Sequence, residues 1–404
     1  MPKKTFLFIF IISISIIITN YFITQNSSSN NFTSSIDTSI ENIHISNSGE
    51  KITIDPIDSI ISKMTLREKV CQMIISTPEK LEETVELPFS GNNQDKLKLA
   101  LENFPLGGLV YFANNLESVE QTKDMINSTK QIATDLSLPP LFFSVDEEGG
   151  KVARCATKLG TTKFSPMYEY RNDGTETAYN NAYTIAKDIS SLGFNLDFAP
   201  VADTWSNKEN TVIGTRAYSD DFTQTAELIS AAVKGFQDGG VYCTLKHFPG
   251  HGDTIQDSHQ ETAYSNKTSE ELASGEYLSF KSGIDADVDM IMMGHITLPS
   301  IDALPSSLSY KIIQEELRGK LNYDGVIITD SLAMGAVTEM YSTDELAVMA
   351  IKAGNDILLM PADLEIAING VLKAIENGEI SEARIDESVK RILELKEFRL
   401  WDVH

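Results

Sequence analysis

The stretch "VYCTLKHFPGHGDTIQDSH", residues 241–259, joins an apolar run to a dense group of polar side chains. It begins with "VYCTL", which is typical of a strand buried on both faces of a parallel sheet. Lys246 and His247 end this strand, and His251 and His259 follow in a loop that contains two glycines. The segment therefore predicts a buried strand that delivers polar side chains to a functional site.

Seven more apolar runs resemble this strand, and amphipathic segments typical of helices separate them. Buried strands that alternate with helices predict a parallel sheet covered by helices on both faces. Eight such repeats over about 350 residues fit an α/β fold of the (β/α)8 TIM-barrel type, with a single catalytic domain. A doubly wound open sheet is the alternative, but no G-x-G-x-x-G motif follows the first strand. The expected strands are 70–76, 107–113, 141–146, 195–201, 241–248, 289–295, 325–330 and 356–361.

Helices are expected between and after these strands. Thr65 and Glu68 have the spacing of a capping box, so a helix should begin at Thr65. A long amphipathic segment close to the C-terminus is expected to complete the fold. The clearest helical segments are 118–136, 178–193, 225–240, 309–321 and 381–398.

The N-terminal residues differ in composition from the rest of the chain. Lys3 and Lys4 precede an apolar run from Thr5 to Thr24, which has the pattern of an export signal and approaches the roughly 20 residues that span a bilayer. No A-x-A-like cleavage site follows, which favours an uncleaved membrane anchor over a cleaved signal. Either way, we expect the rest of the chain to work outside the cytoplasm, membrane-anchored or secreted. The expected division is a signal or anchor at 1–25, a flexible Ser/Asn-rich linker at 26–52, and the catalytic barrel at 53–404.

The composition argues against several classes of partner. The formal net charge of −25 argues against nucleic acid and against an anionic membrane surface. Membrane contact is therefore expected only through the N-terminal anchor, if that anchor is uncleaved. An apolar fraction of 42% with 8% aromatic residues is sufficient for a substantial core. The three cysteines form no C-x-x-C pattern, which argues against a disulfide framework or a cysteine-held metal.

Polar side chains follow several of the expected strands at their carboxyl ends. In a barrel of this type the strand ends meet at one rim, where the active site lies. A single carboxylate there could instead be a helix N-cap, but polar ends on five strands favour a shared site. Asp330 emerges from a buried strand and suits a covalent nucleophile, and charged groups that bind vicinal hydroxyls suit a sugar. The polar residues of this predicted rim are Asp146, Asp203, Arg216, Lys246, His247, His295 and Asp330.

Five segments together resemble one known family. "KHFPGHGDTIQDSH" (246–259) and "GVIITDSLAMGAV" (325–337) are similar to glycoside hydrolase family 3, in its β-N-acetylhexosaminidase branch. "FFSVDEEGGKVAR" (142–154), "NLDFAPVADTW" (195–205) and "VIGTRAYSDD" (212–221) resemble further segments of that family. The similarity covers essentially the whole predicted barrel, and the long K-H-F-P-G-H-G…D-S-H run makes a chance match implausible.

The resemblance implies a reaction and a set of site residues. It implies a retaining exo-β-N-acetylglucosaminidase that needs no cofactor and no metal. Such an enzyme would remove terminal β-linked N-acetylglucosamine from peptidoglycan fragments or related glycans. This carbohydrate is the expected partner, and we expect the protein to be a monomer. Asp330 matches the catalytic nucleophile, His259 the acid/base, and Asp257 the carboxylate paired with it. The positions that match sugar-binding residues are Asp146, Arg154, Arg216, Lys246 and His247.

The implied chemistry is consistent with the residue types. Glycosidases ordinarily use two carboxylates, a nucleophile and a proton donor. A histidine such as His259 can replace the second because imidazole titrates near neutrality, and Asp257 can orient one ring nitrogen. Asp330 would attack the anomeric carbon while His259 protonates the leaving group and later deprotonates water. Two glycines after Pro249 suggest a hinge for a mobile flap, extending to about Tyr264, that carries His259 to the substrate.

Five other functions are compatible with parts of the same pattern. A metal hydrolase is one, because the loop offers ligands, although only His247 stands at a strand end. Substrate-assisted catalysis, by Asp146 with Glu147 or Glu148, would keep the sugar and make the acetamido group the nucleophile. A phosphorylase, a family 3 β-glycosidase of other sugar specificity, and an anchored sugar-binding protein without turnover are the others. The possible metal ligands are His247, His251, Asp253, Asp257 and His259.

Overall fold

The computed structural model describes residues 55–85, 93–254 and 263–400. The chain divides into two units, residues 1–54 and 55–404, and every described residue belongs to the second unit. The predicted anchor and linker therefore lie outside the described residues. Within the described ranges, no helix is both long enough and apolar enough to cross a membrane.

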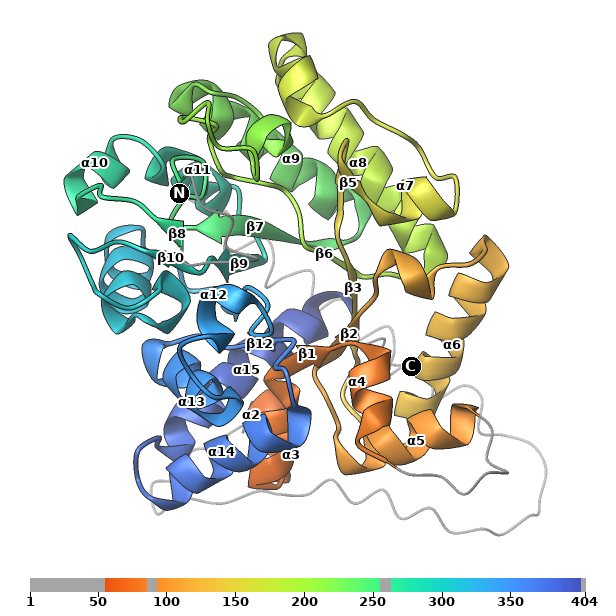
Figure 1. Cartoon of the computed structure of the whole chain (residues 1–404). Coiled ribbons are helices and arrows are strands. Elements are labelled where there is room, and N and C mark those ends of the chain that lie inside the picture. Colours follow the sequence, from red (N-terminus) through yellow and green to blue (C-terminus); the bar gives the residue numbers. More distant parts are fainter. Residues whose placement is uncertain (1–54, 86–92, 255–262, 401–404) are drawn as a thin grey trace, which may run out of the picture. The chain divides into compact units, whose positions relative to one another are not determined.

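Eight parallel strands form a nearly closed barrel (Figure 1). Their order in the sheet is β11-β9-β7-β6-β3-β2-β1-β12, and an isolated parallel bridge between Ile328 and Ile357 joins the two ends. The predicted (β/α)8 barrel is therefore confirmed, and the open doubly wound sheet is excluded. The strands are β1 (Ile74–Ser76), β2 (Gly108–Val110), β3 (Phe142–Val145), β6 (Leu196–Asp197), β7 (Tyr242–Phe248), β9 (Met290–Met293), β11 (Val326–Thr329) and β12 (Leu358–Leu359).

Helices separate the strands along the chain and surround the sheet (Figure 1). The α-helices are α2 (Pro56–Ile61), α3 (Leu66–Gln72), α4 (Pro78–Glu83), α5 (Asn93–Asn103), α6 (Val119–Asp135), α7 (Arg154–Lys158), α8 (Thr175–Leu192), α9 (Phe222–Gly239), α10 (Ser269–Ala273), α11 (Tyr277–Asp285), α12 (Gly335–Thr338), α13 (Thr343–Ala353), α14 (Leu364–Glu376) and α15 (Glu382–Arg399). Short 3₁₀ turns are η1 (Ala113–Asn115), η2 (Met167–Asp173), η3 (Gly214–Arg216) and η4 (Ser306–Leu308).

Two small sheets stand apart from the barrel sheet and connect its loops. β4 (Glu147–Gly149) pairs antiparallel with β5 (Val152–Ala153) directly after β3. β8 (Ala263–Tyr264) pairs in parallel with β10 (Ile296–Thr297), which follows β9. Each pair fixes part of a loop at the carboxyl ends of the barrel strands.

The elements follow the sequence pattern with two differences. The predicted capping box is present, with the Glu68 N–H donating to the Thr65 hydroxyl (3.3 Å) and the Thr65 N–H donating to the Glu68 carboxylate (2.6 Å). The helix that it starts extends to Gln72, so the expectation of a strand from Val70 is wrong at its first residues. The segment at 309–321 is helical over Lys311–Lys320 with π-type hydrogen bonds, a pattern that apolar spacing does not distinguish from an α-helix.

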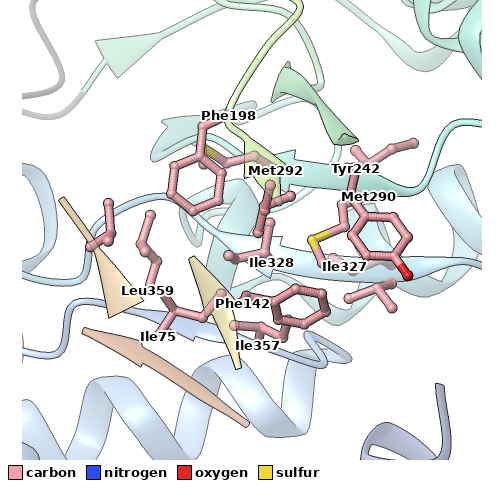
Figure 2. Close-up of a cluster of buried hydrophobic side chains, with 14 of the residues drawn as sticks. Ile75, Phe142, Phe198, Tyr242, Met290, Met292, Ile327, Ile328, Ile357 and Leu359 are labelled. Atoms are coloured by element: carbon pink, nitrogen blue, oxygen red, sulfur yellow. The ribbon is translucent and has the colours of Figure 1, made fainter. Parts of the chain in front are cut away.

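Apolar side chains from strands that are distant in sequence pack together in the core. Figure 2 shows this cluster, with Phe142 from β3, Tyr242 from β7, Met290 from β9 and Ile327 from β11. These side chains are completely buried. Burying one such side chain stabilises the fold by about 1.5–3 kcal/mol, so the core holds the strands firmly in register. The polar groups at the strand ends are therefore carried on a rigid frame.

Candidate active site

The carboxyl ends of the barrel strands carry the polar side chains that the sequence singled out. Asp146 follows β3, Lys246 and His247 lie near the end of β7, and Asp330 follows β11. The Asp330 N–H donates to the Met293 carbonyl (2.8 Å), which extends the hydrogen bonding between β9 and β11 as far as this residue. Because the strands are parallel, these side chains share one rim of the barrel.

Lys246 is a buried cation held between two carboxylates. Its Nζ lies 2.9 Å from Asp146 Oδ1 and 2.7 Å from Glu148 Oε1, and only 3% of its side chain is exposed. Burial lowers the pKa of a lysine, but the charges of Asp146 and Glu148 outweigh it, so the pKa of Lys246 is raised. Lys246 is therefore a cation at physiological pH.

Glu148 also binds Arg216 through both of its oxygens. Arg216 Nε donates to Glu148 Oε2 (2.9 Å), and Arg216 Nη2 donates to Oε1 (2.7 Å). Burial raises the pKa of a carboxyl group, yet Arg216 and Lys246 hold the pKa of Glu148 well below its usual range. This two-point ion pair fixes the plane of the guanidinium group. We call Asp146, Glu148, Arg216 and Lys246 the charge network.

Arg154 reaches the charge network from the first position of α7. Its Nη2 lies 3.6 Å from Asp146 Oδ2, and its guanidinium carbon lies 5.4 Å from the centre of the Phe112 ring. Glu147 holds this helix in place, because its carboxylate accepts the N–H groups of Cys155 (2.7 Å) and of the next residue (2.9 Å). The structure thus brings the predicted residue Arg154 to the same site.

His247 is bound by the buried carboxylate of Asp203. The ring nitrogen Nδ1 of His247 lies 2.7 Å from Asp203 Oδ2, and the side chain of Asp203 is completely buried. The backbone N–H groups of His247 (3.2 Å) and His251 (2.6 Å) donate to the same carboxylate. Burial raises the pKa of Asp203, but the proximity of His247 and the bond from His251 outweigh it, so the pKa is lowered. Asp203 is therefore ionised.

His251 organises the loop that follows β7. Its Nδ1 lies 2.6 Å from the Thr254 hydroxyl oxygen, and its carbonyl accepts a hydrogen bond from the Asn210 amide (2.7 Å). Burial, together with the proximity of His247, lowers the pKa of His251 to about 4, so its ring is neutral at physiological pH. These contacts give His251 a structural role in the loop.

The two glycines beside His251 are points of close approach between segments. A Cβ atom on Gly252 would lie 1.8 Å from the Thr204 carbonyl oxygen. A Cβ atom on Gly250, whose φ is +125°, would lie 2.5 Å from Glu276 Cγ. Close packing accounts for Gly252, and close packing together with a left-handed backbone accounts for Gly250. Most of the flap that the sequence suggested lies outside the described residues, so it stays a prediction.

Asp330 is placed as an ionised carboxylate near two histidines and a backbone hydrogen-bond donor. The Ser331 N–H donates to Asp330 Oδ1 (2.7 Å). Burial raises the pKa of Asp330, but His247, His295 and the Ser331 N–H outweigh it, so the pKa is lowered. His295 in turn supports the loop, since its Nε2 lies 2.9 Å from the Ser331 carbonyl oxygen. A nucleophilic carboxylate must be ionised, and the surroundings of Asp330 favour that state.

Two of the predicted catalytic residues, Asp257 and His259, lie outside the described residues, so their roles stay predictions. The possible metal ligands His247 and His251 each bind protein partners instead, namely Asp203 and Thr254. In the portion of the chain that the structure describes, no group of three or more His, Cys, Asp or Glu side chains could hold a metal ion.

Sequence reasoning did not assign sugar-site roles to Glu148 and Asp203. Glu148 entered only as a possible catalytic acid, but Arg216 and Lys246 engage both of its oxygens. Glu147, the other acid of that alternative, has both oxygens bound to the first turn of α7. These bonds disfavour the substrate-assisted mechanism through either glutamate. The available signal was position alone, since Glu148 closely follows β3 and Asp203 follows β6 on the carboxyl side of the barrel strands.

A parallel barrel whose strand ends carry one ionised carboxylate beside fixed cations and carboxylates has the arrangement of a barrel-type active site. The chain belongs to glycosyl hydrolase family 3, because the model of the glycosyl hydrolase family 3 N terminal domain matches residues 65–395.

Several known proteins are similar to this chain. "Beta-hexosaminidase A" of Pseudoalteromonas piscicida is 32% identical over 327 residues, which cover 74% of this chain and 55% of that protein. "Beta-hexosaminidase" of Haemophilus influenzae (strain ATCC 51907 / DSM 11121 / KW20 / Rd) is 33% identical over 303 residues, which cover 73% of this chain and 83% of that protein. The solved structure of a glycoside hydrolase family 3 beta-N-acetylglucosaminidase from Paenibacillus sp. str. FPU-7 is 36% identical, with a TM-score of 0.77, covering 84% of this chain and 64% of that one. The chain thus spans about half of the first relative and less than two thirds of the solved structure.

Proposed function

We propose that the protein is a retaining exo-β-N-acetylglucosaminidase that hydrolyses terminal β-linked N-acetylglucosamine. The observation that carries this proposal is the charge network (Asp146, Glu148, Arg216 and Lys246) on the same barrel rim as the ionised Asp330. The names of the relatives supply the sugar, since the curated relatives are beta-hexosaminidases and the Paenibacillus protein is a beta-N-acetylglucosaminidase.

The charge network suits an uncharged sugar better than a phosphate group. Its two buried cations, Lys246 and Arg216, are neutralised by Asp146 and Glu148. Charged groups in fixed positions make strong, directional hydrogen bonds to hydroxyl groups. A pair of cations already compensated by carboxylates offers little net attraction to an incoming anion. Arg154 adds a third, partly exposed cation beside Asp146. The balance among the four groups of the charge network supports water over phosphate as the acceptor in the second step.

The reaction would proceed by double displacement. Asp330 attacks the anomeric carbon and forms a glycosyl ester, while His259 donates a proton to the departing oxygen. His259 then removes a proton from water, which attacks the same carbon and releases the sugar with its β configuration retained. Asp257 would orient the imidazole by binding one of its nitrogens. Asp146, Arg154, Arg216, Lys246 and His247 would bind the hydroxyl groups.

The natural substrates would be peptidoglycan fragments or related glycans. This part of the proposal depends on the N-terminal sequence, because an export signal or anchor at residues 1–25 would place the barrel outside the cytoplasm. Fractionation of expressing cells, followed by protease treatment of intact cells, tests this location. Activity that stays with the membranes and is destroyed by external protease supports the anchor. Activity confined to the cytosol would contradict it.

One comparative assay tests the activity. The full chain is incubated with an aryl β-N-acetylglucosaminide, an aryl β-glucoside, chitobiose and a muropeptide disaccharide, with and without phosphate. We expect release of free N-acetylglucosamine from the first, third and fourth substrates, with little turnover of the glucoside and no sugar phosphate. A preference for the glucoside would contradict the proposed sugar. Sugar phosphate as the main product would show a phosphorylase instead.

A matched variant separates turnover from contamination and from simple sugar binding. Asp330→Asn keeps the size of the side chain and its acceptor oxygen but removes the nucleophile, so we expect hydrolysis to fall by at least about 10³-fold. Binding of N-acetylglucosamine, measured by calorimetry, should persist in this variant. Equal hydrolysis by wild type and Asp330→Asn would mean that the activity arises elsewhere. Binding without hydrolysis by the wild type would show a sugar-binding protein.

A further inference from the structure

The carboxylate of Asp203 accepts hydrogen bonds from three N–H positions on one short segment. Its Oδ1 accepts from the His251 backbone N–H (2.6 Å), and its Oδ2 lies 2.7 Å from His247 Nδ1. The backbone N–H of His247 points at the same group, at 3.2 and 3.3 Å from the two oxygens. An ionised carboxylate can only accept hydrogen bonds. The geometry therefore requires the proton of the His247 ring to be on Nδ1.

The protonation of Nδ1 determines what His247 can offer to a ligand. With the proton on Nδ1, the neutral ring carries its lone pair on Nε2, on the side away from Asp203. The ring of His251 packs edge to face against it at 5.8 Å, and that ring is held by Thr254. His247 is thus fixed both in orientation and in tautomer. In the neutral form, Nε2 can accept a hydrogen bond from a sugar hydroxyl group.

We propose that Asp203 is a positioning residue for sugar binding, which acts by fixing the tautomer of His247. Asp203 itself is completely buried and does not need to touch the substrate. Its effect on the sugar rests on the proposed function, whereas its effect on the His247 ring does not. The same carboxylate also fixes the backbone at His251, where the loop leaves the barrel.

The substitution Asp203→Asn reverses this arrangement with almost no change in shape. An asparagine has one oxygen, which must stay near the His251 N–H, because an NH2 group there would place two donors 2.6 Å apart. The NH2 group then faces His247 Nδ1, which can accept only if it is unprotonated. The proton of a neutral ring would move to Nε2, and His247 would become a donor to the sugar. A serine-protease histidine responds in the same way to loss of its aspartate.

The first test reads the tautomer directly and needs no substrate. The full-length wild type and Asp203→Asn are labelled with ¹⁵N-histidine, and His247 is assigned from the signals that His247→Gln loses. We expect a proton on Nδ1 in the wild type at neutral pH and on Nε2 in Asp203→Asn. An unprotonated Nδ1 in the wild type would overturn the proposal, even if Asp203→Asn fails to fold. An unchanged tautomer in a folded Asp203→Asn would also overturn it.

The second test asks whether the effect on the sugar passes through His247. With an aryl β-N-acetylglucosaminide, we expect Asp203→Asn to lower kcat/KM by about 10- to 100-fold, the loss typical of a mismatched buried hydrogen bond. In a His247→Gln background, the same substitution should have little further effect, because the ring that it acts on is gone. Independent, multiplicative losses would overturn the proposal. A wild type without activity on this substrate would refute the proposed function and leave the tautomer result standing.

A matched control separates tautomer control from general loss of a buried acid. Asp356 is equally buried and binds Arg318 (2.8 Å) and Ser388 (2.6 Å) beside the amino end of β12. Asp356→Asn should lower stability while leaving the ¹⁵N signals of His247 and the value of KM unchanged. A shift of the His247 tautomer in Asp356→Asn would show that the readout is not specific, and would overturn the argument from Asp203.

Discussion

Lys246 Nζ lies 2.7 Å from Glu148 Oε1, and both side chains are buried where the barrel strands end. The ion pair joins a residue of β7 to the loop after β3, 98 positions earlier in the chain. Glu148 also binds Arg216, so one carboxylate holds two of the predicted sugar-binding cations. Removing this carboxylate should therefore affect stability and substrate binding together.

We expect Glu148→Gln to lower the free energy of unfolding by about 3 kcal/mol, because it leaves buried cations without full compensation. KM for the N-acetylglucosaminide should rise as Lys246 and Arg216 shift. Urea unfolding and steady-state kinetics measure the two effects. The control is Glu379→Gln, which changes an exposed glutamate 3.6 Å from Lys352 and should alter stability by less than about 0.5 kcal/mol.

The pH dependence of the stability difference between wild type and Glu148→Gln gives a sharper test. The pKa of Glu148 is held well below its usual range in the folded protein, so its charge stabilises the fold above the unfolded pKa of about 4.3. That contribution to stability disappears as the pH falls toward the pKa that Glu148 has in the folded protein. The stability gap between wild type and Glu148→Gln should be constant from pH 6 to 7 and should narrow below about pH 4. A gap that does not change with pH would contradict the ionised, paired state of Glu148.

Lys396 is a further buried lysine, and no ion pair joins it to a carboxylate among the described residues. Its Nζ lies 3.0 Å from Gln72 Oε1 and 4.9 Å from the centre of the Phe142 ring. Burial lowers the pKa of Lys396 to about 7, whereas the pKa of a lysine in the unfolded chain is near 10.4. Above pH 10.4 the side chain is neutral in both states, so its burial costs no charge. As the pH falls toward 7 the unfolded state binds a proton that the folded state does not, so the protein loses stability. Lys396→Met should therefore gain stability over wild type, on the order of 2–3 kcal/mol at pH 6, and lose that advantage at pH 10. Urea unfolding at both pH values measures the stability difference between Lys396→Met and wild type. A difference that does not change with pH would contradict a lowered pKa of Lys396.

Gly252 tests whether the loop after β7 is fixed by packing. Its φ is not in the left-handed region, so Gly252→Ala introduces close contacts with the backbone of Thr204 and Trp205 and no backbone strain at residue 252 itself. We expect about 1–3 kcal/mol of destabilisation and a marked fall in kcat/KM, because Thr204 and His251 lie beside the site. Gly378→Ala is the control, since it strains a residue at φ +76° with no neighbouring atom within 4 Å. It should cost a similar amount of stability without affecting kinetics. Unchanged kinetics in Gly252→Ala would mean that this loop is free to move.

The role of His259 is tested by its dependence on the leaving group. In His259→Ala, kcat/KM should fall by about 10²- to 10⁴-fold for an aryl glycoside with a poor leaving group, since no acid protonates the departing oxygen. A dinitrophenyl glycoside needs no such help, so its kcat/KM should fall far less. Equal losses on both substrates would show that His259 is not the proton donor.

The fold could be predicted from the sequence because its signals are local. Each barrel strand is a short apolar run, and the run from Val241 to Phe248 contains both the buried strand and its polar end. The boundary at Val70 could not be predicted, because one apolar run contains the end of α3 and the start of β1. The π-type hydrogen bonds of Lys311–Lys320 were equally inaccessible, since apolar spacing does not specify the hydrogen-bond register.

The sequence indicated which of the described polar residues lie at the strand ends, but not which of them contact one another. Strand-end position identified Asp146, Lys246 and Asp330, because parallel strands place their carboxyl ends together. The pairing of Glu148 with Arg216, 68 residues away, and of Asp203 with His247, 44 residues away, depends on which side chains meet across the rim. No local pattern encodes those contacts, so the roles of Glu148 and Asp203 in holding the site together emerged only from the structure.

Asp330 is proposed to be the covalent nucleophile, and trapping the glycosyl-enzyme would identify the residue that carries the sugar. The wild type is incubated with a 5-fluoro-N-acetylglucosaminyl fluoride, digested and analysed by mass spectrometry. We expect one sugar per chain, attached to the peptide that contains Asp330, and no label in Asp330→Asn. A label on any other residue, or full hydrolysis of the reagent with no covalent adduct at any time, would contradict it.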